Sequence, residues 1–203
     1  MGLYPQVDQA SFLELRDWWK NSPQWVKPED YEVFLDNIAY RLSKESSEGK
    51  NFLKRYVYSV HLPYRRSALC FFADPDHITI ETRQILLDAF HEDNLLLKND
   101  VVWTCINLTY FPLERQEIEI LVHYPDARLS ALAEVYLCYA FPEERVIRLQ
   151  KCLSSENPRK REYACDVIGD EYIEELKIEL QRLINDPHQD VRDAARINAG
   201  FFE

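Results

Sequence analysis

Apolar residues recur along most of the chain at intervals of three and four, which is the spacing of one face of an α-helix. Near the start, Phe12, Leu15 and Trp19 form such a stripe, and Ser11 before them is a suitable N-cap. Residues 77–82 alternate like a strand, but they lead directly into a helical pattern, so we predict a helix start there. With only four glycines and no Asn-Gly or Asp-Gly hairpin turn, the pattern predicts an all-α protein.

The first fifty residues are expected to form an N-terminal cap of two helices. A proline-containing stretch separates the two helices, and the second is predicted to start at Pro28, a residue that suits the first helical position. The acidic residues that follow it favour the positive end of the helix dipole. The polar stretch "SKESSEGKN", residues 43–51, is predicted to be a loop.

From residue 51 onward one pattern recurs: a basic residue, a small or apolar residue three positions later, and an apolar residue seven positions later. The basic positions are Arg65, Lys98, Arg128, Arg161 and Arg192. They follow one another at steps of 33, 30, 33 and 31 residues, and each comes after an amphipathic segment and a turn. One helix pair cannot bury its apolar face alone, so the pattern predicts stacked helix pairs.

This layout resembles the HEAT-repeat family of armadillo-type helical solenoids, over about residues 51–203. The resemblance is strongest in "LINDPHQDVRDAARINAG" and "LSSENPRKREYACDVIGD". In HEAT units an Asp-Pro turn, a Val-Arg pair and small residues mark the second helix. The steps are shorter than the roughly 40 residues usual in that family, as in short bacterial versions. The resemblance implies a right-handed α-α superhelix of about five helical pairs. Residues 1–50 and 51–203 would then form one continuous domain.

The repeated basic residue is either a binding site or a structural strut. In HEAT units the corresponding arginine bonds to neighbouring loops, and its long stem can lie over apolar residues while its guanidinium meets turn carbonyls and carboxylates. For Arg192, the nearby carboxylates are Asp186 and Asp190. We therefore interpret the five repeated basic positions as structural.

Motifs of known chemistry do not stand out in the sequence. It has no phosphate-binding loop, HExxH, CxxC or GxSxG pattern. The five cysteines are expected to be reduced and buried. Four histidines fall at predicted turns, which stack about 10 Å apart and so are too distant to share a metal. We predict no catalytic residue, cofactor or metal site.

The net charge of -11 bears on the class of partner. A protein that binds duplex nucleic acid or an anionic membrane normally presents a basic face. The charge therefore favours a basic protein partner and makes duplex nucleic acid an unexpected one. The sequence has no apolar run long enough for a membrane span and no signal-peptide pattern, so we expect a cytoplasmic protein. The oligomeric state stays open.

Candidate binding residues lie on the predicted second helix of each pair, which lines the concave face in HEAT-like proteins. The acidic candidates are Glu134, Glu162, Asp166 and Asp193, with Trp103 as an aromatic candidate. Either these carboxylates hold a basic protein segment, or they form an ordinary solvated face. Trp18 and Trp25 are a second, N-terminal group of candidates, whereas Trp19 is expected to pack inward.

The favoured function is a non-catalytic protein-interaction module. A narrower version is a bacterial antidote of the immunity type that masks a basic toxin. The alternative is an enzyme, since some HEAT-like proteins are DNA glycosylases and others are bilin lyases. The negative charge argues against a glycosylase, and a lyase would need a large apolar pocket.

Overall fold

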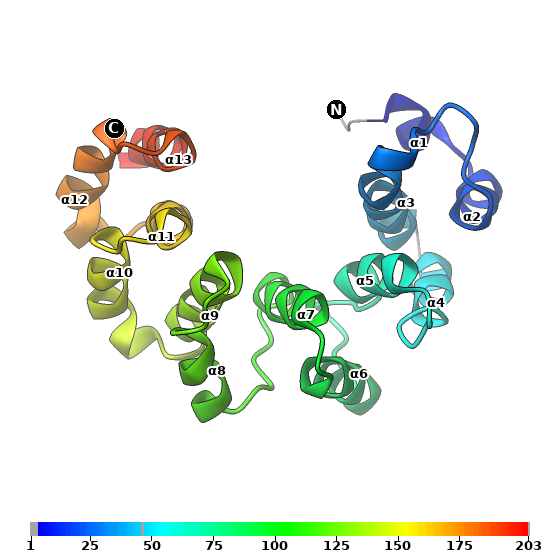
Figure 1. Cartoon of the computed structure of the whole chain (residues 1–203), viewed down its shortest axis with the longest axis horizontal. Helices are drawn as coiled ribbons and strands as arrows, with labels where there is room; N and C mark the ends of the chain where they lie inside the picture. The colour runs from blue at the N-terminus through cyan, green and yellow to red at the C-terminus, as the bar shows by residue number, and fades with distance from the viewer. Residues whose placement is uncertain (1–3, 46, 203) are drawn as a thin grey trace. The chain divides into compact units, whose positions relative to one another are not determined.

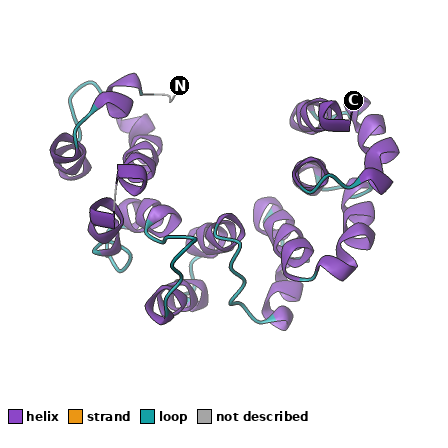
Figure 2. Cartoon of the chain, turned by 180° about the vertical axis from the view of Figure 1, so that it is seen from behind, coloured by secondary structure: helices purple, strands orange, loops and turns teal. Residues whose placement is uncertain are grey.

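A computed structural model describes residues 4–45 and 47–202 of the chain, and within them it contains helices and no strand (Figure 2). The α-helices are α1 (Pro5–Gln9), α2 (Phe12–Lys20), α3 (Tyr31–Glu45), α4 (Ser47–Lys54), α5 (Leu62–Phe71), α6 (Ile80–His91), α7 (Leu95–Asn107), α8 (Arg115–Leu121), α9 (Ala127–Ala140), α10 (Arg145–Leu153), α11 (Pro158–Asp170), α12 (Lys177–Arg182) and α13 (Gln189–Ala199). Short 3-10 helices cover Pro28–Asp30, Pro142–Glu144, Glu174–Leu176, Leu183–Asn185 and Gly200–Phe202. The all-α prediction is confirmed.

Several predicted helix boundaries are confirmed. Ser11 caps α2 by accepting a hydrogen bond from the Glu14 amide, and Pro28 opens the 3-10 turn that leads into α3. The alternating stretch 77–82 contains the start of α6, at Ile80, rather than a strand. Thr79 caps this helix through reciprocal hydrogen bonds with the residue three positions later.

The predicted loop over residues 43–51 is wrong. The end of α3 and the first part of α4 occupy most of this stretch, and residue 46 lies outside the described residues. Phe52 and Leu53 are buried, so packing of the apolar face of α4 stabilises a helix whose first residues are polar. A Cβ atom at Gly49 would lie 1.8 Å from the Leu42 carbonyl oxygen, which shows how closely α4 approaches α3.

The chain divides into two compact units, Met1–Thr104 and Cys105–Glu203, and the division falls near the end of α7. We call them unit 1 and unit 2. In unit 1, α3, α5 and α7 lie in one layer, and α2, α4 and α6 lie in the other (Figure 1). Trp19 is fully buried beneath the rings of Phe52, Tyr56 and Tyr64, with centroids 5.4 to 6.2 Å from its own. The expectation that Trp19 packs inward is confirmed.

In unit 2, α9, α11 and α13 form one layer, with α11 packed between the other two, and α8, α10 and α12 form the second layer (Figure 1). Small side chains line the contacts of the first layer, so these helices approach closely. They include Ala131, Ala133, Ala164, Cys165, Ala194 and Ala195, all buried. At Gly169 a Cβ atom would lie 2.0 Å from the Asn198 amide oxygen, so the Asn198 side chain of α13 packs directly on the α11 backbone.

Candidate interaction surfaces

The repeated basic residues mostly bind backbone carbonyls near the turn before their own helix. Arg65 Nε donates to the Val57 carbonyl at 2.9 Å, and Lys98 Nζ donates to the Phe90 carbonyl at 2.5 Å. Arg161 and Arg192 contact carbonyls six residues earlier, those of Ser155 at 2.7 Å and Asp186 at 2.8 Å. At four of the five positions the side chain therefore makes the contacts of a strut.

Arg161 also joins two successive turns of unit 2. Its guanidinium holds the Asp186 carboxylate with two hydrogen bonds, of 2.7 and 2.9 Å, and the side chains are only 12% and 4% exposed. These bonds keep the pKa of Asp186 below its ordinary value. Because Arg161 occupies this carboxylate, Arg192 uses the carbonyl of Asp186 rather than the carboxylate considered from the sequence.

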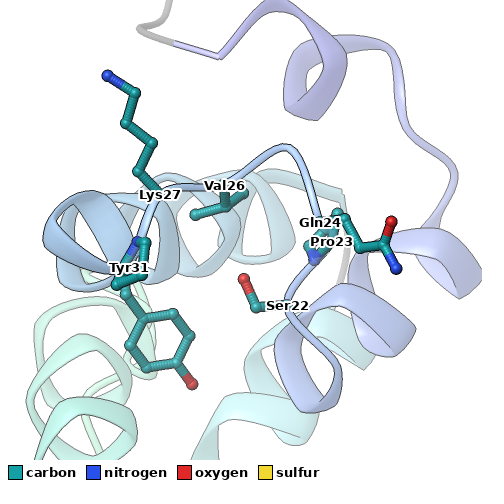
Figure 3. Close-up of a pocket in the computed structure, with 7 residues that line it drawn as sticks. Ser22, Pro23, Gln24, Val26, Lys27 and Tyr31 are labelled. Atoms are coloured by element: carbon teal, nitrogen blue, oxygen red, sulfur yellow. The ribbon is translucent and has the colours of Figure 1, made fainter.

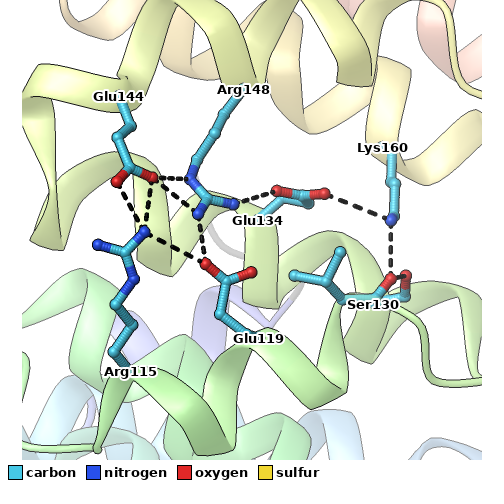
Figure 4. A network of polar contacts seen from close by, with 8 residues as sticks. Arg115, Glu119, Ser130, Glu134, Glu144, Arg148 and Lys160 are labelled. Carbon is cyan, nitrogen blue, oxygen red and sulfur yellow. Dashed lines mark hydrogen bonds and ion pairs between the residues drawn. The ribbon is translucent and has the colours of Figure 1, made fainter.

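Arg128 differs from the other four, because it is exposed and does not bind the preceding turn. The Val122 carbonyl, eight residues before Ser130, instead accepts from the Ser130 hydroxyl at 2.6 Å and from Lys160 Nζ at 2.8 Å (Figure 4). The strut interpretation therefore does not hold for Arg128. Ser130 and Lys160, which are not part of the repeat pattern, bind the turn carbonyl in its place.

Glu134 lies within a charge network between the helices of unit 2 (Figure 4). Arg148 is the centre of this network, 3.4 Å from Glu134, 2.9 Å from Glu144 and 2.5 Å from Glu119. Lys160 approaches Glu134 from the other side at 3.6 Å, and the Glu134 side chain is only 13% exposed. The expectation of an available carboxylate at Glu134 is therefore corrected: two internal cations already compensate it.

Glu162 and Asp193 also have partners within unit 2. The Glu162 carboxylate accepts a 2.6 Å hydrogen bond from Arg159, one helical turn earlier on α11. Asp193 is exposed on α13, where it accepts from Gln189 at 2.7 Å and lies 3.3 Å from Arg196. Both carboxylates are therefore partly balanced by charged or polar side chains of their own helix.

Asp166 on α11 is the predicted acidic candidate without an ion pair. Its carboxylate accepts a hydrogen bond from the Asn198 amide at 2.9 Å, and the residue keeps an exposed edge. Partial burial of the carboxylate against the packed layer, together with the nearby charges of Glu162 and Asp170, raises the pKa of Asp166 to about 6. The negative charge at this place is costly, and a cation from outside would relieve it.

Trp103 is half-buried in α7, and its ring meets Phe71 of α5 edge to face with centroids 5.9 Å apart. Phe71 in turn meets Tyr40 of α3 at 5.8 Å. The structure therefore assigns Trp103 to an aromatic row in unit 1, separate from the acidic candidates of unit 2. Tyr40 and Phe71 were missed from the sequence, although Tyr40, Phe71 and Trp103 follow one another at steps of 31 and 32 residues.

Trp18 and Trp25 lie together near the N-terminus. Their rings are 5.7 Å apart, and Trp25 also packs at 5.3 Å against Phe34 and at 6.1 Å against Tyr4. Trp25 is 44% exposed, whereas Trp18 is half-buried. Of the two tryptophans, Trp25 presents the larger exposed surface.

A shallow hollow of about 390 Å³ lies beside this aromatic group (Figure 3). The residues that line it are Ser22, Pro23, Gln24, Val26, Lys27, Pro28 and Tyr31. The Lys27 ammonium extends away from the Tyr31 ring (Figure 3). The Tyr31 pKa is raised by burial and by a hydrogen bond with Tyr64, so its hydroxyl stays protonated. This hollow has no nucleophile paired with a base.

The cysteines are unfit for nucleophilic chemistry. Burial raises the pKa of every one of the five thiols above its ordinary value, so none is activated as a thiolate. Residues 4–45 and 47–202 contain no group of three side chains of the metal-binding types that could hold an ion. Within the same residues, no helix has both the length and the apolar character needed to cross a membrane.

No protein-family profile and no curated protein matches this chain. Among solved structures, the chain is similar to the crystal structure of an engineered protein from the Northeast Structural Genomics Consortium, with 11% identity. That alignment covers 93% of this chain and 96% of the engineered protein, at a TM-score of 0.42. A likeness at this level gives no information about function.

Proposed function

We propose that the chain is a HEAT-like helical-repeat protein, a right-handed superhelix without catalytic activity, that binds a basic protein partner in the cytoplasm. The observation that carries the binding proposal is Asp166, a carboxylate with a raised pKa and no ion pair on the exposed side of α11. The repeated struts Arg65, Lys98, Arg161 and Arg192 support the HEAT-like part of the proposal.

The binding surface centres on Asp166 and Asp170. These carboxylates stand four residues apart, and thus on one side of α11, and both are exposed. They also lie toward the negative end of the helix dipole, which adds to the local negative potential. A Lys or Arg side chain of the partner would offset this potential and lower the Asp166 pKa, so the carboxylate would be fully ionised in the complex.

Charge reversal tests the proposal. The tagged full-length chain and its Asp166→Lys/Asp170→Lys variant are used to capture partners from a native-host lysate at low and high salt, with mass spectrometry to identify them. The proposal expects a stoichiometric basic protein that the wild type retains at low salt and releases at high salt, because exposed charge pairs are screened. The variant should capture none of it.

The matched control is Glu143→Lys/Glu175→Lys, which changes the net charge equally at exposed positions outside α11. This variant should bind as well as the wild type does. Once the partner is known, its affinity should fall as pH drops below about 6, where Asp166 takes up a proton. Equal loss of binding in both variants would show a general charge effect, and undiminished binding of the α11 variant would overturn the placement.

A further inference from the structure

In the layer α3, α5 and α7 of unit 1, three aromatic rings, one from each helix, pack in a row. We call Tyr40, Phe71 and Trp103 the aromatic row. Successive ring centroids are 5.8 and 5.9 Å apart, and each pair is edge to face, at 75° and 74°. Tyr40 is 52% exposed and the other two are half-buried, so the row presents apolar surface to solvent.

Carboxylates of α3 and α7 lie beside the row, around an arginine of α5. Arg66 of α5 donates to Asp100 of α7 at 2.7 Å and to Glu32 of α3 at 2.9 Å. Asp36 of α3 accepts a hydrogen bond from the Ser67 hydroxyl at 2.5 Å. Its negative charge also favours the protonated form of the Arg66 guanidinium. One guanidinium thus lies among three carboxylates.

The positions of these residues place the two groups next to each other. Asp36 precedes Tyr40 by four residues and Asp100 precedes Trp103 by three, so each carboxylate lies about one helical turn from a ring of the row. Lys44 stands at the other side of Tyr40, with its ammonium 5.4 Å from the ring centroid. The rings of the aromatic row therefore form an apolar strip, and the carboxylates form an acidic strip beside it.

We propose that the aromatic row docks an amphipathic helical segment of a partner protein, with apolar side chains on the rings and Lys or Arg facing Glu32 and Asp36. The ring spacing is close to the roughly 6 Å between residues i and i+4 of a helix, and helices laid across an apolar strip use anchors at this interval. Single-stranded nucleic acid also stacks on aromatic rings, but its phosphates would meet these carboxylates.

This surface is independent of the proposed function, because it lies in unit 1 and depends on apolar contact as well as charge. Its probe is a synthetic 18-residue helical peptide of Leu and Lys with all Leu on one face. A scrambled peptide of the same composition, without an apolar face, is the control. Calorimetry with the full chain measures both affinities, and ¹⁹F NMR of the 5-fluorotryptophan-labelled chain reports whether the Trp103 signal moves.

We expect the amphipathic peptide to bind and the scrambled peptide to bind much more weakly, with a shift of the Trp103 signal and none at Trp25. Tyr40→Ala should weaken binding about five-fold or more, as truncation of an interface anchor does. Tyr58→Ala, at a 55% exposed tyrosine of the same unit, should change nothing.

The Asp166→Lys/Asp170→Lys variant separates the two proposals, since it should keep its affinity for the amphipathic peptide. Equal binding of the two peptides would overturn the docking proposal, and so would equal affinity of the wild type and Tyr40→Ala. Loss of peptide binding in the α11 variant, with an unmoved Trp103 signal, would also overturn it and would assign the peptide to unit 2.

Discussion

The two units are packed with different kinds of side chain. Among the described residues, unit 1 buries five large aromatic rings, and unit 2 buries two. Those of unit 1 are Trp19, Phe34, Phe52, Phe72 and Phe90, and those of unit 2 are Tyr136 and Phe202. Unit 2 instead buries mainly leucine, isoleucine and valine, together with alanine and cysteine. Large rings fill the space between helices that stand apart, whereas smaller side chains let helices approach closely, so unit 1 depends on its buried rings more than unit 2 does.

The largest expected effect is that of Trp19→Ala in the aromatic core of unit 1. The side chain is fully buried among three rings, and its removal should destabilise the protein by about 3–5 kcal/mol, since lost burial and a cavity both contribute. Urea unfolding measures the loss, and hydrogen exchange should locate it in unit 1. Trp25→Ala is the control, because that ring is 44% exposed and should cost much less. Equal costs would show that unit 1 does not depend on its buried rings.

Next is the strut of unit 2, tested by Arg161→Leu. This change leaves the nearly buried Asp186 carboxylate without its guanidinium, and breaking such a pair costs about 3 kcal/mol. Arg128→Leu changes the exposed member of the same repeat pattern and should stay within about 0.5 kcal/mol of the wild type. Thermal unfolding of the two variants gives the comparison, and similar melting temperatures would remove the distinction between them.

Close approach in unit 2 predicts a smaller effect for Gly169→Ala. The added methyl would overlap the Asn198 side chain, and overpacking of this kind costs about 1–3 kcal/mol. Asn198→Ala removes the two closest atoms, Oδ1 and Cγ, and leaves Cβ at 2.8 Å from the added methyl, so the double variant should cost somewhat less than the sum of the single changes. A double-mutant cycle by urea unfolding measures this coupling. Strict additivity would mean that α11 and α13 do not meet at this point.

The smallest effect concerns Asp166→Asn and depends on pH. The folded-state pKa is raised to about 6, so between about pH 4 and 6 the folded chain holds a proton that the unfolded chain releases, and stability falls as pH rises through this window. The asparagine variant escapes the penalty and should be the more stable form at about pH 7.5, by less than about 1 kcal/mol because the side chain is partly exposed. Melting temperatures should converge near pH 4. A variant that is less stable at every pH would contradict this account.

Local signals in the sequence identified the helical class and several helix starts. Ser11 and Pro28 act within one turn of their own position, so their roles could be predicted without tertiary information. The inward packing of Trp19 followed from the spacing of its apolar neighbours. The basic positions of the repeat were also found, and four of them contact a turn, because the contact is made within eight residues.

Contacts between helices were not predictable in the same way. The start of α4 is locally polar and is fixed by its approach to α3, and Glu134 is compensated by Arg148 and Lys160 from α10 and α11. The aromatic row likewise unites residues 31 and 32 positions apart. Which charges are already balanced and which rings meet depends on helix register, and one sequence does not specify that register residue by residue.

The bridge between Arg161 and Asp186 restricts where unit 2 can be shortened. A fragment that stops after α11 would keep the guanidinium but lose the carboxylate and the turn that it holds. A fragment that starts after Arg161 would keep Asp186 without its cation. Expression boundaries and repeat grafts in this region should therefore keep residues 155–187 together, so that the unit of transfer is α11 and α12 with the turn before α11 and the turn after α12.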